Sequence, residues 1–399
     1  MANQTGKNLY VAYKVEATLN TTPAVGDAEV MRLSASPGLG ISMPTILPTE
    51  IRKDMLTVMG RLGSRSVSGS FTGDLSVNCW DTLLQAAMRS TWATLVEIDD
   101  SDSSASVTVT AAGINGSATA DFIAEGVKVG DVFRITGLAA TADTGRNLRV
   151  KSVASAAIGV VETLTAEATD VTTYTITLAR KLTNAATPTR RSFHLEQYYQ
   201  DIDQSLLFGG CRVGGFTLRG EPDGMASIEV RMAGMSQEVK ATGDSPVFTT
   251  PTEYATDPLV FVDAKIAKGG TDIATATSFE LVGELGGQTL PVIGSTVSPD
   301  VFDNEFVVNG SLSLLRTDLD NLEALDAETE YELHILLEEP SGTPAKCFSL
   351  FLPRVKFSGV TAALGQDGAM IETIPFMVGL KDTTAGYDRT MLKVSEFLT

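Results

Sequence analysis

The feature that most constrains this chain is an internal duplication, which shows as two matched pairs of segments in the same order. Residues 66–84 and 307–325 both begin with an alternating strand pattern around a Gly-Ser pair, and both continue into a short helical pattern. Residues 211–234 and 353–379 both begin with Arg-Val, turn at Asp-Gly and return as an alternating strand that ends in Met-x-Gly. The order and the similarity predict tandem copies of one β-rich module.

Both short helices are expected to bury one apolar face. Apolar side chains three or four positions apart lie on one side of a helix, and the following residues have that spacing: Trp80, Leu83, Leu84, Ala87 and Met88 in the first copy, and Leu319, Leu322 and Leu325 in the second. Asn78 is expected to cap the first helix. Thr317 and Asp320 are expected to form a capping-box-like start for the second.

The two copies differ by one insertion. Gly69 lies 143 positions before Arg212, whereas Gly310 lies only 44 positions before Arg354, so the first copy contains 99 additional residues. Residues 101–190 are rich in Thr, Ala, Val and Ser and contain no Trp, Cys or Met. We expect a small inserted β domain, either a barrel or a sandwich, that points outward from a loop and leaves the fold of the module intact.

These patterns predict a mainly β chain with three structural units. The first module comprises residues 1–100 and 191–250, the inserted surface β domain comprises residues 101–190, and the second module comprises residues 251–399. Each module is expected to be a β-sandwich or barrel-like unit with one short helix. The length of 399 residues is consistent with two or three domains.

The charge of the chain argues against specific binding of nucleic acid. There are 49 acidic and 30 basic residues, which gives a formal net charge of -19. Such a field repels phosphate groups. Residues 101–190 contain eight acids and eight bases, so the acidic surplus belongs to the two modules.

Cysteine usage and hydropathy indicate where the chain folds. Cys79, Cys211 and Cys347 are widely spaced and form no metal-binding pattern, so we expect small core residues in a reducing compartment. The N-terminal residues include no apolar stretch of signal-peptide length. No run approaches the ~18 apolar residues that a membrane helix requires. We therefore expect folding in a cytoplasm and no membrane association.

The sequence offers little catalytic chemistry. His194 and His334 both lie in strand patterns, and we expect both to face solvent instead of binding a metal. The acidic cluster at residues 99–102 lacks the glycine turn and the distal glutamate of an EF-hand loop. Phosphate-binding and nucleophile-elbow motifs are absent from the sequence. We predict no catalytic, cofactor-binding or metal-binding residues, no cofactor and no enzyme activity.

One segment has the character of an interface. Residues 36–66 form a long linker between strand patterns, and loops of this length often have a function. The linker is unusually apolar, with eight candidate interface residues: Met43, Ile46, Leu47, Ile51, Met55, Leu56, Met59 and Leu62. Such side chains have to be buried somewhere. Two alternatives are open: a strand pair packed within its own domain, or an arm that becomes ordered against a neighbouring subunit.

These residues also resemble a known family. Residues 68–75, Ser-Gly-Ser-Phe-Thr-Gly-Asp-Leu, followed by the helical stretch at residues 80–87, resemble the strand-then-helix signature of siphophage major tail tube proteins, from phages with long non-contractile tails. Residues 211–234 are similar to that family too, and the C-terminal copy follows a looser version. The resemblance implies a structural virion protein of the tail, built from sandwich or barrel-like modules with one flanking helix. It does not extend to the inserted stretch.

The resemblance also implies how the chain assembles. In such tails six modules form a ring, and stacked rings form a hollow tube that holds DNA and a tape-measure protein. The expected partners are further copies of this chain and the tape-measure, tail terminator and distal tail proteins. Because the chain carries two modules, we expect three copies per ring with pseudo-sixfold symmetry, and a ring of six copies is the alternative. An acidic lumen is expected to let DNA pass without specific binding, and the apolar linker is expected to contact the next ring.

Other functions stay open at this point. A distal tail or baseplate hub protein is the closest alternative, and a multidomain β adhesin that binds the host surface is another. A carbohydrate-active enzyme would require aromatic platforms beside paired carboxylates, whereas Trp80 and Trp92 are the only tryptophans. For the tail protein we expect assembly in the host cytoplasm.

Overall fold

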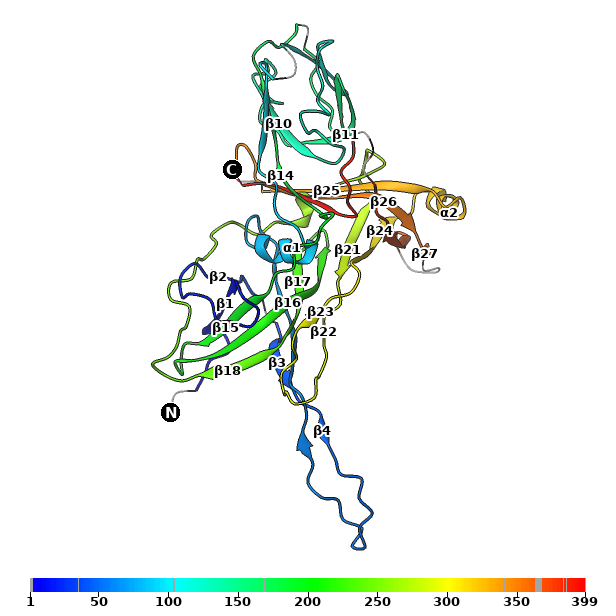
Figure 1. Cartoon of the computed structure of the whole chain (residues 1–399). Coiled ribbons are helices and arrows are strands. Elements are labelled where there is room, and N and C mark those ends of the chain that lie inside the picture. The colour runs from blue at the N-terminus through cyan, green and yellow to red at the C-terminus, as the bar shows by residue number, and fades with distance from the viewer. Residues whose placement is uncertain are drawn as a thin grey trace.

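The computed structural model describes residues 3–34, 36–102, 105–167, 169–339, 342–362, 368–382, 384 and 386–398. Within these residues the chain is mainly β, with two α-helices, which confirms the predicted fold class. Figure 1 shows strands β10 and β11 at the top of an elongated molecule, a large twisted sheet across its middle, and a thin arm around β4 at the bottom.

The first module surrounds helix α1 with two groups of strands. Its elements are β1 (Leu9–Val15), β2 (Glu29–Val30), β3 (Gly38–Ser42), β6 (Ser66–Asp74), α1 (Asp81–Met88), β15 (Phe193–Tyr199), β16 (Gln204–Gly220), β17 (Ser227–Gly234) and β18 (Ser236–Lys240).

The second module repeats this order of elements. Its elements are β19 (Lys265–Lys268), β20 (Thr271–Ile273), β21 (Ala276–Glu284), β24 (Val307–Leu315), α2 (Asp320–Asp326), β25 (Glu330–Glu338), β26 (Cys347–Phe357), β27 (Thr361–Ala362), β28 (Ile371–Val378) and β29 (Lys393–Phe397). A one-turn 3-10 helix, η1 (Phe261–Asp263), precedes it.

Strand pairing confirms the duplication. In the first module, β1 pairs with β2 and β15, β16 pairs with β15, β17 and β18, and β6 pairs with β3 and β17. In the second, β19 pairs with β20 and β25, β26 pairs with β25, β28 and β29, and β24 pairs with β21 and β28. Each pairing of one module therefore has its counterpart in the other.

Strand β16 is long enough to belong to both groups of strands in the first module. Its first half pairs with β15 and β18, and its second half pairs with β17. Gly210, with φ of 64°, lies where the strand passes from one group to the other. A Cβ atom at this position would come within 2.5 Å of Met235 Sδ, so the passage requires glycine.

One hydrophobic core runs through both modules. It includes Phe71 and Trp80 of the first module, Phe279 and Phe376 of the second, and Phe216 of β16 between them. The rings of Phe279 and Phe376 stack at 6.4 Å between centroids. The two modules are therefore joined by packing as well as by the chain.

The two helices differ in burial. Trp80, Leu83 and Leu84 are fully buried in the main core. In the second module Leu325 is half-buried, but Leu319 and Leu322 are exposed, so the predicted apolar core face of α2 is wrong for these two residues. The predicted caps are also wrong: Trp80 and Leu319 occupy the N-cap positions, and neither helix has a side-chain cap. No helix in the described ranges is long and apolar enough to cross a membrane.

The inserted stretch forms a separate seven-stranded sheet in the order β7-β13-β10-β11-β12-β9-β8. Its strands are β7 (Val96–Asp99), β8 (Val107–Thr110), β9 (Gly113–Gly116), β10 (Val132–Thr136), β11 (Leu148–Ala154), β12 (Ala157–Val160) and β13 (Thr175–Leu178). This inserted domain has its own core cluster, which includes Phe122, Phe133 and Ile176. Its entry and exit lie between α1 and β15, so every pairing of the first module is preserved.

The inserted domain belongs to the first module by sequence but docks on the second module. Strand β14 (Arg180–Thr183), which leaves the domain, pairs with β29. Gly130 lies directly against the ring of Phe351 on β26, and Arg134 Nη2 donates a hydrogen bond of 2.6 Å to the Ala345 carbonyl. Sequence reasoning missed this docking because no local pattern identifies which distant surface an insertion will cover.

Candidate assembly interfaces

The apolar linker predicted from the sequence is a long hairpin that leaves the body of the protein. Strands β3 and β6 pair from Gly38 opposite Ser70 to Ser42 opposite Ser66. Residues 43–65, here called the long arm, continue this hairpin beyond the end of the sheet. Figure 1 shows the long arm in blue, pointing away from the body.

The long arm is held by short local contacts at its base. Strand β4 (Thr45–Ile46) pairs with β5 (Arg61–Leu62), and the Gly63 amide donates to the Pro44 carbonyl at 2.7 Å. Gly60 fits closely here, since a Cβ atom would come within 2.6 Å of the Ile46 carbonyl oxygen. The remaining residues extend as a loop with few contacts to the rest of the chain.

The candidate interface residues are on the surface of this arm. Met43 is half-buried, and the other seven are exposed, with Ile51, Met55 and Met59 more than 90% exposed. The alternative that the segment packs within its own domain is therefore wrong. The role of these residues as an interface stays a prediction, and exposure of large apolar side chains in a row is consistent with it.

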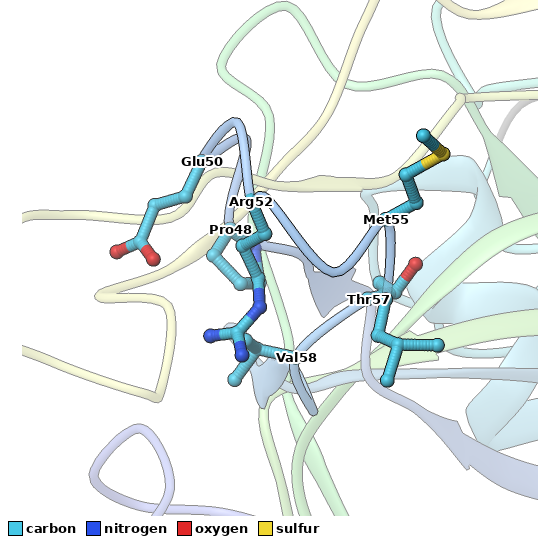
Figure 2. A pocket seen from close by; sticks show the side chains of 7 residues that line it. Pro48, Glu50, Arg52, Met55, Thr57 and Val58 are labelled. Atoms are coloured by element: carbon cyan, nitrogen blue, oxygen red, sulfur yellow. The ribbon is translucent and has the colours of Figure 1, made fainter.

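The tip of the long arm encloses a shallow recess without catalytic character. Its lining residues are Pro48, Glu50, Arg52, Met55, Leu56, Thr57 and Val58. Figure 2 shows that the Glu50 and Met55 side chains point in opposite directions, so no polar groups converge on a common centre. Arg52 forms an ion pair with Asp54 at 2.6 Å, which stabilises the turn.

A second, shorter arm lies at the corresponding place in the second module, and sequence reasoning missed it. Strands β22 (Gln288–Thr289) and β23 (Val301–Phe302) pair within residues 285–306, here called the short arm. Its tip exposes Leu290 and Ile293. The base of the long arm touches the tip of the short arm, where the Arg65 amide donates to the Thr296 carbonyl at 2.8 Å. The Leu-Pro-Val-Ile run at residues 290–293 was the available signal.

The two modules are joined edge to edge. The second half of β16 pairs with β21, from Gly215 opposite Glu284 to Gly220 opposite Phe279. The counterpart of β21 in the first module is β3, and the counterpart of this half of β16 is residues 357–361 after the bend of β26. Among the described residues, these two counterparts have no partner strand on the corresponding side. In the described part of the sheet that joins the modules, there is therefore one internal junction and two open edges, β3 and residues 357–361.

The exposed face of this joined sheet is rich in hydroxyl groups and has paired charges. Ser and Thr residues occupy most outward positions of β6 and two of those on β24, Ser311 and Ser313, and Thr373 is the one on β28. Arg219 lies 2.9 Å from Glu280 and 3.4 Å from Glu229, and Arg231 lies 3.1 Å from Glu284. The acidic surplus of the modules is therefore not concentrated on these strands.

Both histidines are buried, which contradicts the prediction that they face solvent. His194 Nδ1 lies 2.8 Å from Glu16 Oε1, and His334 Nε2 lies 2.8 Å from Ser349 Oγ. Burial lowers the pKa of His334 well below its usual value, and the nearby Arg149 and Lys393 charges lower it further. Both residues act as hydrogen-bonded parts of the core.

A buried carboxyl pair joins the helix of the first module to the last strand. Arg180 contacts Asp81 at the start of α1 and Glu396 on β29, and its guanidinium lies 4.6 Å from the Trp92 ring centroid. Burial and the neighbouring Asp81 carboxylate raise the pKa of Glu396 well above its usual value. Burial likewise raises the pKa of Asp81. The protonated form of Glu396 is thus favoured in the folded state.

A second buried network fixes the inserted domain. Lys393 Nζ lies 2.7 Å from both Asp131 Oδ1 and Asp388 Oδ2, and Lys181 Nζ lies 3.0 Å from Asp131 Oδ2. Burial alone would lower the pKa of Lys181, but the carboxylates of Asp131 and Asp388 outweigh burial and raise it. The network connects the inserted domain, its exit strand and the C-terminal segment.

The described residues contain no group of three or more His, Cys, Asp or Glu that could hold a metal ion. Asp99 and Asp102 bond to backbone and hydroxyl groups of their own turn. Cys79, Cys211 and Cys347 are buried and unbridged. The surfaces that stand out in this part of the chain are therefore the two arms and the two open strand edges.

Comparison with known protein families gives a match over most of the chain. The profile of a protein family described as phage tail tube protein matches residues 6–378. No curated protein matches the chain.

Proposed function

We propose that this chain, which belongs to the phage tail tube protein family, closes into rings of three copies that stack into a hollow tube for the passage of DNA. Membership of the family makes it a structural protein of the virion tail, built to associate with itself and with other tail proteins. The ring, its stoichiometry and the conduit role are the proposed parts. The observation that carries them is the pairing of β16 with β21 inside one chain.

The junction inside the chain serves as a template for the junction between chains. Each module has one edge of the kind formed by β16 and one of the kind formed by β21. Inside the chain, the β16 edge of the first module pairs with the β21 edge of the second. The open edge of β3 in one copy then accepts residues 357–361 of the next copy, in the way that β21 accepts β16. Closing the ring pairs both of these open edges, which removes the hazard that they would pose if exposed.

The template also gives the register between copies. Val213 and Phe357 are equivalent because they pair with β17 and β28 at matching places, opposite Met232 and Phe376, which themselves lie opposite Gly69 and Gly310. Thr217 and Thr361 lie four residues further on, opposite Glu229 and Thr373, and are equivalent too. Leu281 and Leu39 are equivalent because they lie opposite Gly310 and Gly69.

Within the chain, Thr217 lies opposite Val282. By this equivalence Thr361 of one copy lies opposite Gly40 of the next. Both positions are exposed, and a Cβ atom on Gly40 would have nothing within 4 Å.

Cysteine cross-linking tests this register directly. A mixture of G40C and T361C chains should form a disulfide between copies under mild oxidation, detected as a dimer band on a non-reducing gel. The control is the pair T217C and V282C in one chain, which should close an internal disulfide at the equivalent position. The natural cysteines do not compete because all three are buried. An internal bond in the control without any bond in the mixture would contradict the ring.

The width of the tube distinguishes three copies from six. Each chain contributes eight strands to the shared sheet, namely β3, β6, β17, β16, β21, β24, β28 and β26. At about 4.8 Å per strand, three copies give a closed sheet roughly 37 Å across, whereas six copies give roughly 73 Å. Electron microscopy of assembled tubes measures this diameter.

The proposed lumen surface is suited to passage without binding. Tight binding of DNA requires arrays of Lys and Arg that contact phosphates. On the exposed face of the sheet Arg219 and Arg231 are already paired with glutamates. This surface is also less acidic than the sequence led us to expect, so hydroxyl groups and paired charges, and not a strong repulsive field, keep DNA mobile.

The remaining surfaces fit the same arrangement. The long arm leaves the sheet along its strands, so it is placed to reach the next ring of a stack. The inserted domain lies at the opposite end of the molecule from the long arm (Figure 1). We assign the tape-measure, terminator and distal tail proteins as partners, assembly to the host cytoplasm, and no catalytic role to this chain.

A further inference from the structure

An exposed apolar patch lies on the second module, at the end of the sheet away from the arms. It consists of Leu315, Leu319, Leu322, Met370 and Ile371, here called the α2 patch, and all five are more than a third exposed. Leu315 lies opposite Ile371 in the strand ladder, and the Arg316 amide donates to the Met370 carbonyl at 2.9 Å. The five side chains therefore belong to one continuous region.

The α2 patch is fixed in place and does not result from a loose helix. Buried Glu372 accepts hydrogen bonds from Arg316 Nε at 3.1 Å and from Asn321 Nδ2 at 2.5 Å. Asn321 lies on α2 and Glu372 on β28, so the helix is tied to the sheet. Leu319 and Leu322 are held on the outside while Asn321 and Ala324 face inward.

The long arm and the α2 patch lie at opposite ends of the same sheet. Ser42 and Ser66 begin the arm at one end, and the aligned strands carry that end across to Val307. Leu315 and Ile371 mark the other end. Complementary surfaces at opposite ends of a molecule lead to head-to-tail assembly, which continues as a filament.

The two surfaces have opposite charge. The long arm, residues 43–65, contains four bases and two acids, although the whole chain has a net charge of -19. Residues 318–326 around α2 contain four acids and no base: Asp318, Asp320, Glu323 and Asp326, all exposed. The short arm, residues 285–306, contains three acids and no base, so it does not fit an acidic surface. Of the two arms, only the long one matches the α2 patch in both charge and hydrophobicity.

We propose that the α2 patch is the receptor for the long arm of a second copy in the adjacent ring. The apolar arm residues cover Leu319, Leu322 and their neighbours, and Lys53 and Arg61 face the acids of α2. This inference rests on the proposed function, since it requires stacked rings. It adds the receiving surface, which explains why the side chains of a helix with a core-like pattern are left uncovered.

Paired charge reversal tests the contact. The arm variant K53E/R61E and the α2 variant D320K/E323K should each reduce sedimentable tubes by about tenfold or more, because like charges placed together oppose association. Combining all four substitutions in one chain should restore tubes to near the wild-type amount. The control E97K/D100K changes the net charge by the same amount as D320K/E323K, but it lies on the inserted domain and should have no effect on the amount of tubes. A melting curve for each variant confirms that it is folded.

The outcomes separate this inference from the proposed function. The cross-link between G40C and T361C chains reports ring closure independently of stacking. Rings that cross-link but do not stack in either charge variant, together with rescue in the combination, support the receptor. Normal stacking of D320K/E323K, or failure of the combination to rescue, overturns the receptor and leaves the ring proposal standing; a different protein or surface then covers the patch. Absence of the cross-link in the wild-type background overturns both.

Discussion

At the scale of single residues, Glu396 is a buried group whose ionisation affects the stability of the fold. Its carboxyl group is buried beside Asp81 and Arg180, and it connects the C-terminal strand to the first helix. The pKa of Glu396 is raised in the folded state by burial first and by Asp81 second. The folded protein therefore holds a proton there that the unfolded chain releases at lower pH.

This raised pKa predicts the sign of a pH effect. The stabilisation is fully present below the unfolded-state pKa of Glu396 and is lost as pH rises through its folded-state pKa, with a slope of at most about 1.4 kcal/mol per pH unit. E396Q, which is neutral at every pH, should therefore flatten the fall in the free energy of unfolding above pH 5. Chemical denaturation of the wild type and of E396Q from pH 5 to 9 measures how the free energy of unfolding changes with pH. The exposed variant E323Q should follow the wild type, and an equal slope in E396Q would contradict the assignment.

Single residues also show where sequence reasoning reaches its limit. Alternation along β25 places His334 on the face turned away from the main core, as the sequence pattern predicted. The inserted domain covers that face, and its Arg149 lies near enough to lower the pKa of His334. His194 is covered in the same way by Glu16 from the segment after β1. A period of two identifies the face of a strand, whereas burial of the second face depends on segments far away in the chain.

At the scale of elements, the exposed arm should influence assembly and leave folding unchanged. I51S/M55S/M59S replaces three side chains that are more than 90% exposed, so the melting temperature should stay within about 1–2 °C of the wild type. Tubes should be lost, because those side chains are buried only in the stack. Differential scanning fluorimetry measures the melting temperature, and negative-stain microscopy shows whether tubes form. The matched variant L290S/I293S on the short arm shows whether any exposed apolar tip has the same effect.

The elements that could be predicted are those with strong local signals. Gly-Ser pairs, Asp-Gly turns and the helix after β6 and β24 identified the repeat, because both copies retain them. The pairs β1 with β19 and β2 with β20 share no readable pattern, and only their hydrogen bonding shows that they correspond. The apolar arm was visible as composition. Its projection from the body was not, since the same residues fit a packed strand pair equally well.

At the scale of the whole molecule, the docked inserted domain should unfold together with the modules. Lys393 is almost fully buried and depends on Asp131 of the inserted domain for one of its two carboxylate partners. D131N should destabilise the docked state by about 3 kcal/mol, because breaking one partner of a buried pair leaves uncompensated charge. Calorimetry should then show a separate, lower transition for the inserted domain. D100N, on the exposed surface, should retain the wild-type profile, and an unchanged transition in D131N would show that the apolar contact of Gly130 with Phe351 is sufficient.

Strands β16 and β21 belong to the same chain, and this has a consequence for how a ring grows. In a closed ring of three, half of the seams form while each chain folds, at the high effective concentration of a tethered partner. Fewer collisions between separate molecules are then needed for closure than with single-module chains. The two halves are also released from having to be identical. The first module carries the long basic arm and the inserted domain, whereas the second carries the acidic residues around α2. The proposed ring of six modules would therefore have only threefold symmetry, with the two kinds of module alternating and contributing different surfaces.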